Sequence, residues 1–117
     1  MSEMPLLDRS LIEELRAIPH ASGNLAVFLV SMYVQQFEGL WARLEVAVAE
    51  GDTDAVADGA HRLRSGSLQC GMSRAGEVLA SIEYPARDGH RMPSAERLAQ
   101  VQDVLRRSIS AATDAAR

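Results

Sequence analysis

Residues 24–52 read NLAVFLVSMYVQQFEGLWARLEVAVAEGD and decide the fold. Apolar and small side chains recur every three or four residues in this stretch, at Ala26, Leu29, Tyr33, Phe37, Leu40, Leu44 and Ala47. That spacing is typical of an amphipathic α-helix, and at 1.5 Å per residue it predicts a helix about 40 Å long over residues 24–50. Gly51 is expected to end this helix, and Asp52 or Thr53 to cap the next one.

Shorter helices are expected on both sides of this stretch. Asp8 is the expected N-cap of a helix over residues 8–18, which Pro19 would end. A further helix is expected over residues 53–70, with Gly71 as its end. Its seam of apolar or small residues is Val56, Ala60, Leu63, Ser67 and Cys70.

Two more helices are expected in the rest of the chain. One begins near Ser73, and Pro85 is expected to kink or end it. Residues 86–93 are expected to form a loop, and Ser94 to cap the last helix. No strand-like alternation is found. The sequence therefore predicts an all-α protein: an antiparallel, up-down-up-down four-helix bundle over about 24–115, with a short extra N-terminal helix, in a single domain over residues 1–117.

Composition narrows the possible partners and the compartment. The chain has 117 residues, 16 acidic and 12 basic side chains and a net charge of -4, which argues against nucleic acid as a partner. Cys70 is the only cysteine, and no apolar run approaches the roughly 20 residues of a membrane helix. A monomeric, cytoplasmic protein that does not insert into membranes is expected.

The candidate site lies on the helix predicted over residues 53–70. With Val56 at the origin of a helical wheel, the core seam falls within about 40°, whereas His61 falls near 140°. His61 is therefore expected to point to solvent. Arg64 is three positions away and within side-chain reach. Neighbouring positions form a candidate docking surface for a partner, namely Ala57, Arg62, Ser65 and Leu68.

These features suit the transfer of a phosphoryl group through a histidine. An ordinary imidazole, with a pKa of about 6.5, is a competent nucleophile near neutral pH. A phosphoryl group carries negative charge on its oxygens, which the guanidinium of Arg64 would stabilise. Small neighbours such as Ser65 would let a partner approach the ring of His61 closely.

Three motifs in this region resemble the histidine phosphotransfer (HPt) domain family. They are AHRLRSGS at residues 60–67 followed by Gly71, LASIE at residues 79–83, and a Gly-Asp turn at residues 51–52. The resemblance implies that His61 is the phosphoacceptor. Arg64 replaces the family's lysine and keeps its charge, whereas Ser65 replaces the family's glycine and adds a hydroxymethyl group on the docking face.

The resemblance also implies the partners and the cofactors. The partner would be the receiver domain of a response regulator, of a hybrid sensor kinase, or of both. Magnesium is expected on that receiver domain, and this chain is expected to bind no cofactor and no metal. No ATP-binding motif is found, so the protein is expected to be a phosphoryl carrier that relays the group between receiver aspartates, and not an enzyme.

The same residues allow other readings. His20 and His90 follow Pro19 and Gly89 in turns without a supporting helix face, so neither is the expected phosphoacceptor. Asp58 and His61 have the spacing of metal ligands on a helix, but no second copy of the motif exists. The alternative that stays open is an HPt-like module that binds a receiver or another regulatory partner without carrying phosphate.

Overall fold

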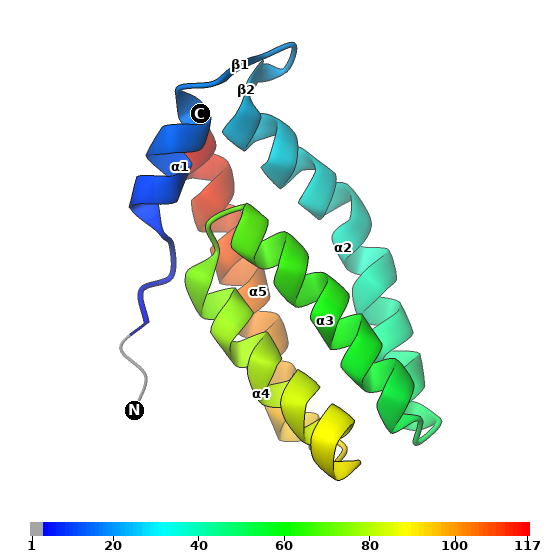
Figure 1. Ribbon diagram of the computed structural model, residues 1–117. Helices are drawn as coiled ribbons and strands as arrows, with labels where there is room; N and C mark the ends of the chain where they lie inside the picture. Colours follow the sequence, from blue (N-terminus) through cyan, green and yellow to red (C-terminus); the bar gives the residue numbers. More distant parts are fainter. Residues whose placement is uncertain (1–3) are drawn as a thin grey trace.

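A computed structural model describes residues 4–117 as a helical bundle (Figure 1). Its elements in chain order are α1 (Arg9–Arg16), β1 (Pro19–His20), β2 (Gly23–Asn24), α2 (Leu25–Ala49), α3 (Thr53–Gln69), α4 (Ser73–Gly89) and α5 (Ala95–Ala116).

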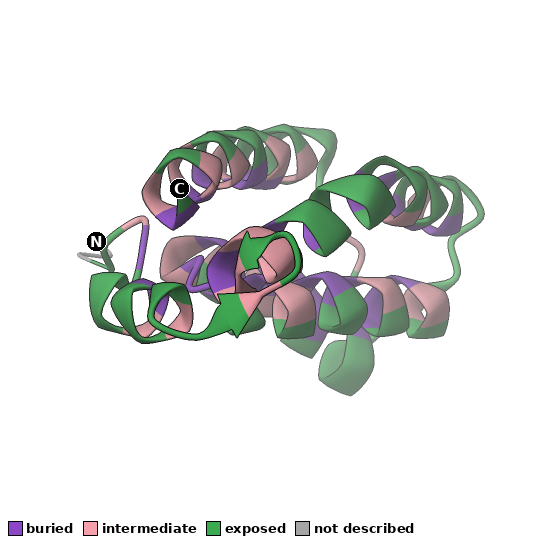
Figure 2. Cartoon of the chain, turned by 90° about the horizontal axis from the view of Figure 1, so that it is seen from above, coloured by how far each residue is buried: buried purple, intermediate pink, exposed green. Residues whose placement is uncertain are grey.

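The four long helices α2 to α5 run alternately up and down, and α1 lies across one end of the bundle (Figure 1). Helix α3 packs against both α2 and α4, and α5 packs against the same two helices from the other side. Seen from above, the buried residues face the space between the helices and the exposed residues face outward (Figure 2). The predicted all-α bundle with an extra N-terminal helix is confirmed.

Local side-chain chemistry sets where the helices begin. The N-cap side chains of Asp8, Asn24, Asp52 and Ser94 each accept a hydrogen bond from the backbone N–H three residues later, which satisfies an otherwise free donor of the first turn. The turn after α2 needs a left-handed backbone at Gly51, which has a φ of 71°. The sequence signals for these boundaries were therefore correct to within one or two residues.

The core stripe of α2 differs from the predicted one at two positions. Val30 and Trp41 are buried, whereas Leu29 and Leu40 are half-buried. Both sets satisfy a spacing of three or four residues, and the contacts of α2 with two neighbouring helices decide between them. The residues of α2 that the bundle buries are Ala26, Val30, Tyr33, Phe37, Trp41, Leu44 and Ala47.

The loop predicted over residues 86–93 is wrong, because α4 continues through Pro85 to Gly89. Proline removes one backbone hydrogen bond inside a helix. Two contacts of the last turn offset that loss: Ala86 is completely buried, and Arg87 bonds to Glu83 one turn earlier. The irregular segment is reduced to residues 90–94.

Between α1 and α2 the chain forms a small hairpin that the sequence analysis did not foresee. Pro19 pairs with Asn24 and His20 with Gly23, in antiparallel register. Strands of two residues are too short to show alternation in a sequence. Over the described residues 4–117, no helix has the length and apolar character needed to cross a membrane.

Candidate functional site

His61 lies near the middle of α3, on the side that faces α4. Its side chain is 49% exposed, which agrees with the position expected from the helical wheel. The exposed part of the ring faces solvent, whereas Nδ1 points toward α4 and lies 3.0 Å from Oε2 of Glu83. The histidine is therefore accessible at one edge and held by the protein at the other.

Glu83 is a charged residue in the core of the bundle, with a side chain only 1% exposed. It follows Leu79 by one turn of α4 and thus lies on the inward face of that helix. Its carboxylate accepts hydrogen bonds from His61, from Nε of Arg64 at 2.7 Å and from Arg87. Burial of a carboxylate is tolerated when hydrogen bonds and opposite charges compensate it, and three donors do so here.

The ionisation of Glu83 fixes the proton on His61. Burial raises the pKa of a carboxyl group, but the hydrogen bonds from Arg64, Arg87 and His61 outweigh burial and lower the pKa of Glu83. An ionised carboxylate can only accept, so the 3.0 Å bond requires the hydrogen on Nδ1 of His61. The lone pair of the ring then lies on Nε2, the nitrogen on the far side from Glu83.

Arg64 is bound to the same carboxylate and is half-buried. Its side chain is 21% exposed, and its guanidinium lies 5.4 Å from the ring centre of Tyr84, in cation–π geometry. The hydrogen bond to Glu83 raises the pKa of Arg64. One terminal nitrogen lies 3.4 Å from Nδ1 of His61, so the cation is beside the ring as predicted.

Arg87 completes the cluster from the last turn of α4. It donates to Oε2 of Glu83 and lies 3.5 Å from a carboxylate oxygen of Asp58 on α3. The hydrogen bond to Glu83 raises the pKa of Arg87. Two arginines therefore neutralise the buried Glu83 from two sides, and His61 shares that carboxylate with both.

The predicted docking residues are only partly brought together. Ser65 and Leu68 are exposed on the same side of α3 as His61, and Arg62 is exposed on the side toward α2. Ala57 was predicted on this surface, but this prediction is wrong because Ala57 is only 2% exposed. Helix α3 packs on α2 and α4 at once, so its buried face is wider than a single seam and includes this position.

Two glycines explain how α3 fits between its neighbours. A Cβ on Gly66 would lie 2.9 Å from the ring of Tyr33 on α2, so the glycine serves the approach of another helix. A Cβ on Gly76 would lie 2.5 Å from a methyl group of Leu68. Leu68 is 44% exposed, as expected, but it also packs over Gly76 and therefore contributes to the α3–α4 contact.

The other two histidines lie outside this cluster. In the hairpin, the ring of His20 bonds to Ser22. At the end of α4, Nδ1 of His90 lies 3.3 Å from Oγ1 of Thr53. Among residues 4–117, no group of three or more histidine, cysteine or acidic side chains could hold a metal ion. The carboxylate of Asp58 is directed to Arg87 instead of joining His61 as a ligand pair.

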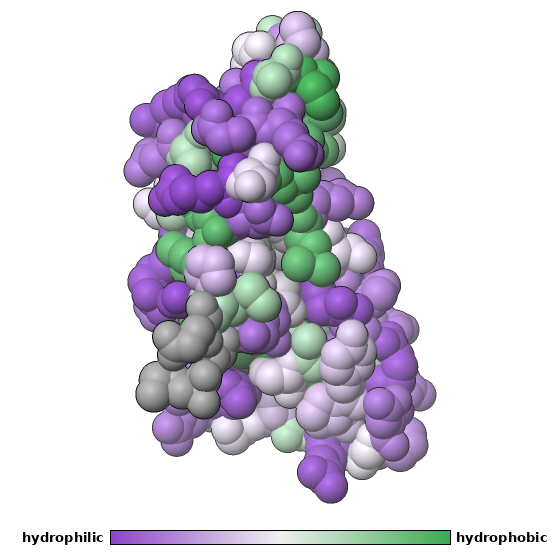
Figure 3. All heavy atoms as spheres, turned by 60° about the vertical axis from the view of Figure 1, so that its left-hand side comes forward, coloured by the Kyte–Doolittle hydropathy of each residue, from purple (hydrophilic) through white to green (hydrophobic). Residues whose placement is uncertain are grey.

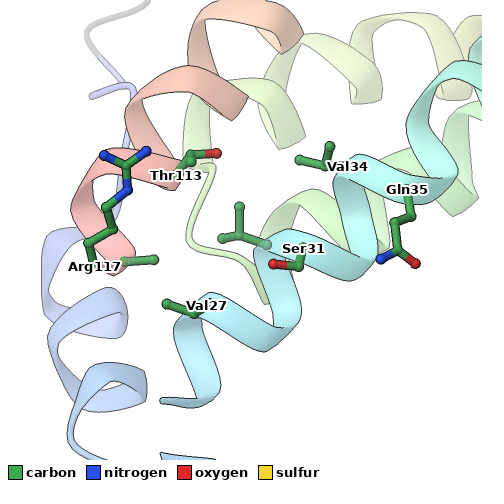
Figure 4. A pocket seen from close by; sticks show the side chains of 8 residues that line it. Val27, Ser31, Val34, Gln35, Thr113 and Arg117 are labelled. Atoms are coloured by element: carbon green, nitrogen blue, oxygen red, sulfur yellow. The ribbon is translucent and has the colours of Figure 1, made fainter. Parts of the chain in front are cut away.

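Two hollows in the surface are lined by residues other than His61. One of about 340 Å³ opens between α2 and the end of α5, where Val27, Ser31 and Val34 face Thr113 and Arg117 (Figure 4). On the face turned forward in Figure 3, the strongly hydrophobic atoms gather in the upper half, at the height of α1 and the hairpin. The site around His61 is thus an exposed position on a helix face and not an enclosed pocket.

Three members of the site, Glu83, Tyr84 and Arg87, were not predicted as site residues, although Glu83 ends the LASIE motif at residues 79–83. A signal for Glu83 was present, because an acidic residue one turn after Leu79 on an apolar helix face must find cationic partners if it is buried. Arg87 was masked by the expectation that α4 ended at Pro85. The contact of Tyr84 with Arg64 depends on the packing of α3 against α4, which no local pattern predicts.

Comparison with known families agrees with this arrangement. The family model of the Hpt domain matches residues 29–112, which is 84 of the 117 residues. No match was found among curated proteins. The match spans α3 and α4 and most of α2 and α5, and so contains His61 and its whole cluster.

The fold and the site thus define a helical phosphotransfer module, and the chain belongs to the Hpt domain family. Hpt domains serve histidine phosphotransfer in two-component signalling, as carriers rather than conventional enzymes. Their class of partner is the receiver domain or the kinase of a phosphorelay.

Proposed function

We propose that His61 accepts a phosphoryl group on Nε2 from the aspartate of one receiver domain and passes it to the aspartate of another. The observation that carries this proposal is the hydrogen bond from Nδ1 of His61 to the buried, ionised Glu83. It leaves the lone pair on the outward nitrogen, where a partner can reach it.

The transfer needs no base from this chain. The Nε2 lone pair attacks phosphorus, the N–P bond forms, and the P–O bond to the donor aspartate breaks, so the aspartate leaves as a carboxylate. The imidazole ring becomes positively charged because Nδ1 keeps its hydrogen. Glu83 faces that hydrogen and stabilises the charge, in the way that an acidic residue supports a catalytic histidine. Transfer to the second receiver reverses these bond changes.

Arg64 would stabilise the phosphoryl oxygens without leaving Glu83. Its Nε donates to Oε1 of Glu83, and a terminal nitrogen lies 3.4 Å from Nδ1 of His61, the ring nitrogen that faces Glu83. A guanidinium has five donors, so both contacts are compatible. Magnesium would be held by the partner receiver domain, close to the same phosphoryl group. Ser65 and Leu68 would contact that partner beside the ring.

A two-step phosphotransfer experiment tests the proposal. The protein is first labelled with radioactive phosphoramidate and purified, and is then mixed with magnesium and each member of a panel of receiver domains from the source organism. We expect acid-labile, base-stable label on the wild type and rapid movement of that label to at least one receiver. His61→Gln should take up no label and keep its helical circular dichroism.

Two results would overturn the proposal. If the wild type binds a receiver but neither accepts nor returns phosphate, the protein is an interaction module. If His61→Gln is labelled at the wild-type rate, the phosphoacceptor lies elsewhere.

A further inference from the structure

A second feature beside His61 is a polar groove between α2 and α3. It encloses about 330 Å³ and is lined by Gln35, Gln36, Gly39, Leu40, Arg43 and Arg62. Nothing lies within 4 Å of the place where a Cβ on Gly39 would be, so the groove stays open at its middle. Two guanidinium groups and two side-chain amides therefore surround a hollow whose lining includes no acidic residue.

The two arginines of the groove are unpaired within residues 4–117. Neither Arg43 nor Arg62 has an ion pair or a side-chain hydrogen bond there, whereas Arg64, Arg87 and Arg106 all face carboxylates. Asp58, four positions before Arg62 on α3, lines the neighbouring hollow with both arginines, but the ion pair of its carboxylate is with Arg87, at 3.5 Å. Arg9, Arg91 and Arg97 also lack ion pairs in the described part of the chain, but Arg43 and Arg62 line the same groove and leave ten guanidinium donors available in it.

The position of the groove relates it to the phosphotransfer site. On the helical wheel of α3, Ser65 lies opposite the buried Val56, and His61 and Arg62 lie about 40° and 60° to either side of Ser65 at 100° per residue, with the exposed Asp58 between Ser65 and Arg62. A stable protein interface covers about 800 Å² on each partner. A partner centred on His61 and Ser65 therefore also covers Arg62 and reaches Arg43 across the groove.

We propose that this groove binds acidic side chains on the surface of the receiver domain that docks at His61. The inference rests on the proposed phosphotransfer function and names the chemistry of its partner. Carboxylates fit because guanidinium groups bind them through two parallel hydrogen bonds, and the Gln35 and Gln36 amides add further donors. Unpaired charges at the edge of an interface mainly raise the rate of association and select among partners.

Charge reversal tests the proposal with the receiver domain that exchanges phosphate fastest with the wild type. Arg43→Glu and Arg62→Glu are compared singly and together, and Arg97→Glu on α5 is the matched control, because that exposed arginine also has no ion pair in the described part of the chain. Each single variant should slow receiver-dependent transfer about three- to ten-fold, and the pair more, whereas the control should change it less than about two-fold. Labelling by phosphoramidate, which needs no docking, should stay within about two-fold of the wild type in all variants.

Salt and a charge swap complete the test. Raising the salt from about 0.02 M to about 0.5 M should slow transfer to the wild type much more than transfer to the double variant. Replacing acidic residues of the receiver with lysine should restore transfer to the double variant. If the double variant exchanges phosphate at the wild-type rate, or if Arg97→Glu slows transfer equally, the groove does not bind the receiver. If no receiver exchanges phosphate with the wild type, the proposed function itself fails.

Discussion

At the scale of single residues, the site depends on a carboxylate that lies in the core. Glu83 accepts from His61, Arg64 and Arg87, and each of these bonds has a separate consequence. The bond from His61 fixes the ring hydrogen on Nδ1, and the bond from Arg64 holds a cation beside the ring. The bond from Arg87 adds a further positive charge that keeps Glu83 ionised. The exposed histidine is thus oriented by a residue that solvent hardly reaches.

Replacing Arg64 with alanine should slow phosphoryl transfer about ten-fold, which corresponds to roughly 1 to 2 kcal/mol of barrier and the loss of one charge-assisted hydrogen bond. Arg64→Lys is the matched control. Lysine keeps the charge but lacks the planar set of N–H donors with which a guanidinium can bind Glu83 and the phosphoryl group together. Arg64→Lys should therefore recover only part of the rate. Stopped-flow or quenched-flow transfer rates measure the effect. Equal rates for wild type and Arg64→Ala would reduce Arg64 to a structural partner of Glu83.

His61 and Arg64 were identifiable from sequence because a helical wheel needs only one helix. Glu83 ends the LASIE motif, but its role and the role of Arg87 could not be predicted, because both depend on how α3 and α4 face each other. Periodicity showed that Glu83 shares a face with Leu79. It could not show which cations lie opposite.

At the scale of the helices, close packing of α3 against its neighbours depends on glycine. Gly66→Ala should lower the free energy of unfolding by about 1 to 2 kcal/mol, because the new methyl group would overlap the Tyr33 ring and the gain in helix propensity is smaller. That ring cannot move easily, since its hydroxyl is bonded to Ser67 and to the carbonyl of Leu63.

Gly39→Ala is the control for this prediction, because it adds the same methyl group to a helix in open space. It should raise the free energy of unfolding by about 0.5 to 1 kcal/mol. Urea unfolding followed by circular dichroism measures both. If the two substitutions shift stability in the same direction, the Tyr33 contact does not constrain residue 66.

The exposed side of α3 gives a prediction about docking. Ser65→Phe should slow receiver-dependent transfer by about 100-fold or more, because its ring would hold the partner away from His61, and small misplacements of reacting groups have effects of that size. Labelling by phosphoramidate and thermal stability should change little, since Ser65 is exposed. Ser65→Gly should be tolerated. Unchanged transfer to Ser65→Phe would place the docking face elsewhere.

Helix boundaries were predictable where capping chemistry sets them, as at Asp8, Asp52 and Ser94. The end of α4 was not, because proline inside a helix is locally unfavourable and only tertiary contacts offset its cost. The burial of Ala86 and the bond from Arg87 to Glu83 are contacts of that kind. The same reasoning covers Ala57, whose burial follows from packing against a second helix.

At the scale of the whole molecule, Glu83 links stability to pH. Its pKa is lower in the folded protein than its ordinary value of 4.5, so its contribution to stability is present above about pH 4.5 and is lost as the pH falls through the folded value. The free energy of unfolding should therefore decrease on acidification more steeply for the wild type than for Glu83→Gln. Urea unfolding at a series of pH values between about 7 and 3 measures this difference. Parallel curves for the two proteins would show that Glu83 is not stabilised by its partners.

The architecture as a whole was the most predictable level. Four amphipathic segments joined by short turns allow few arrangements other than an antiparallel bundle, and the alternating direction of α2 to α5 follows from the short turns. The tilt of the helices, and with it the α2–α3 groove, depends on side-chain packing along the full length of the bundle. No single segment of the sequence contains that information.

In the proposed mechanism, the phosphoryl group is carried on Nε2 of His61, and the ring keeps its hydrogen on Nδ1. NMR of the protein labelled with ¹⁵N at histidine and phosphorylated by phosphoramidate tests it most directly, because phosphorus–nitrogen coupling identifies the substituted nitrogen. We expect coupling to Nε2 of His61 and a proton on Nδ1 whose hydrogen bond to residue 83 is lost in Glu83→Ala, which has no side-chain acceptor. Phosphate on Nδ1 of His61, or on His20 or His90, would contradict it.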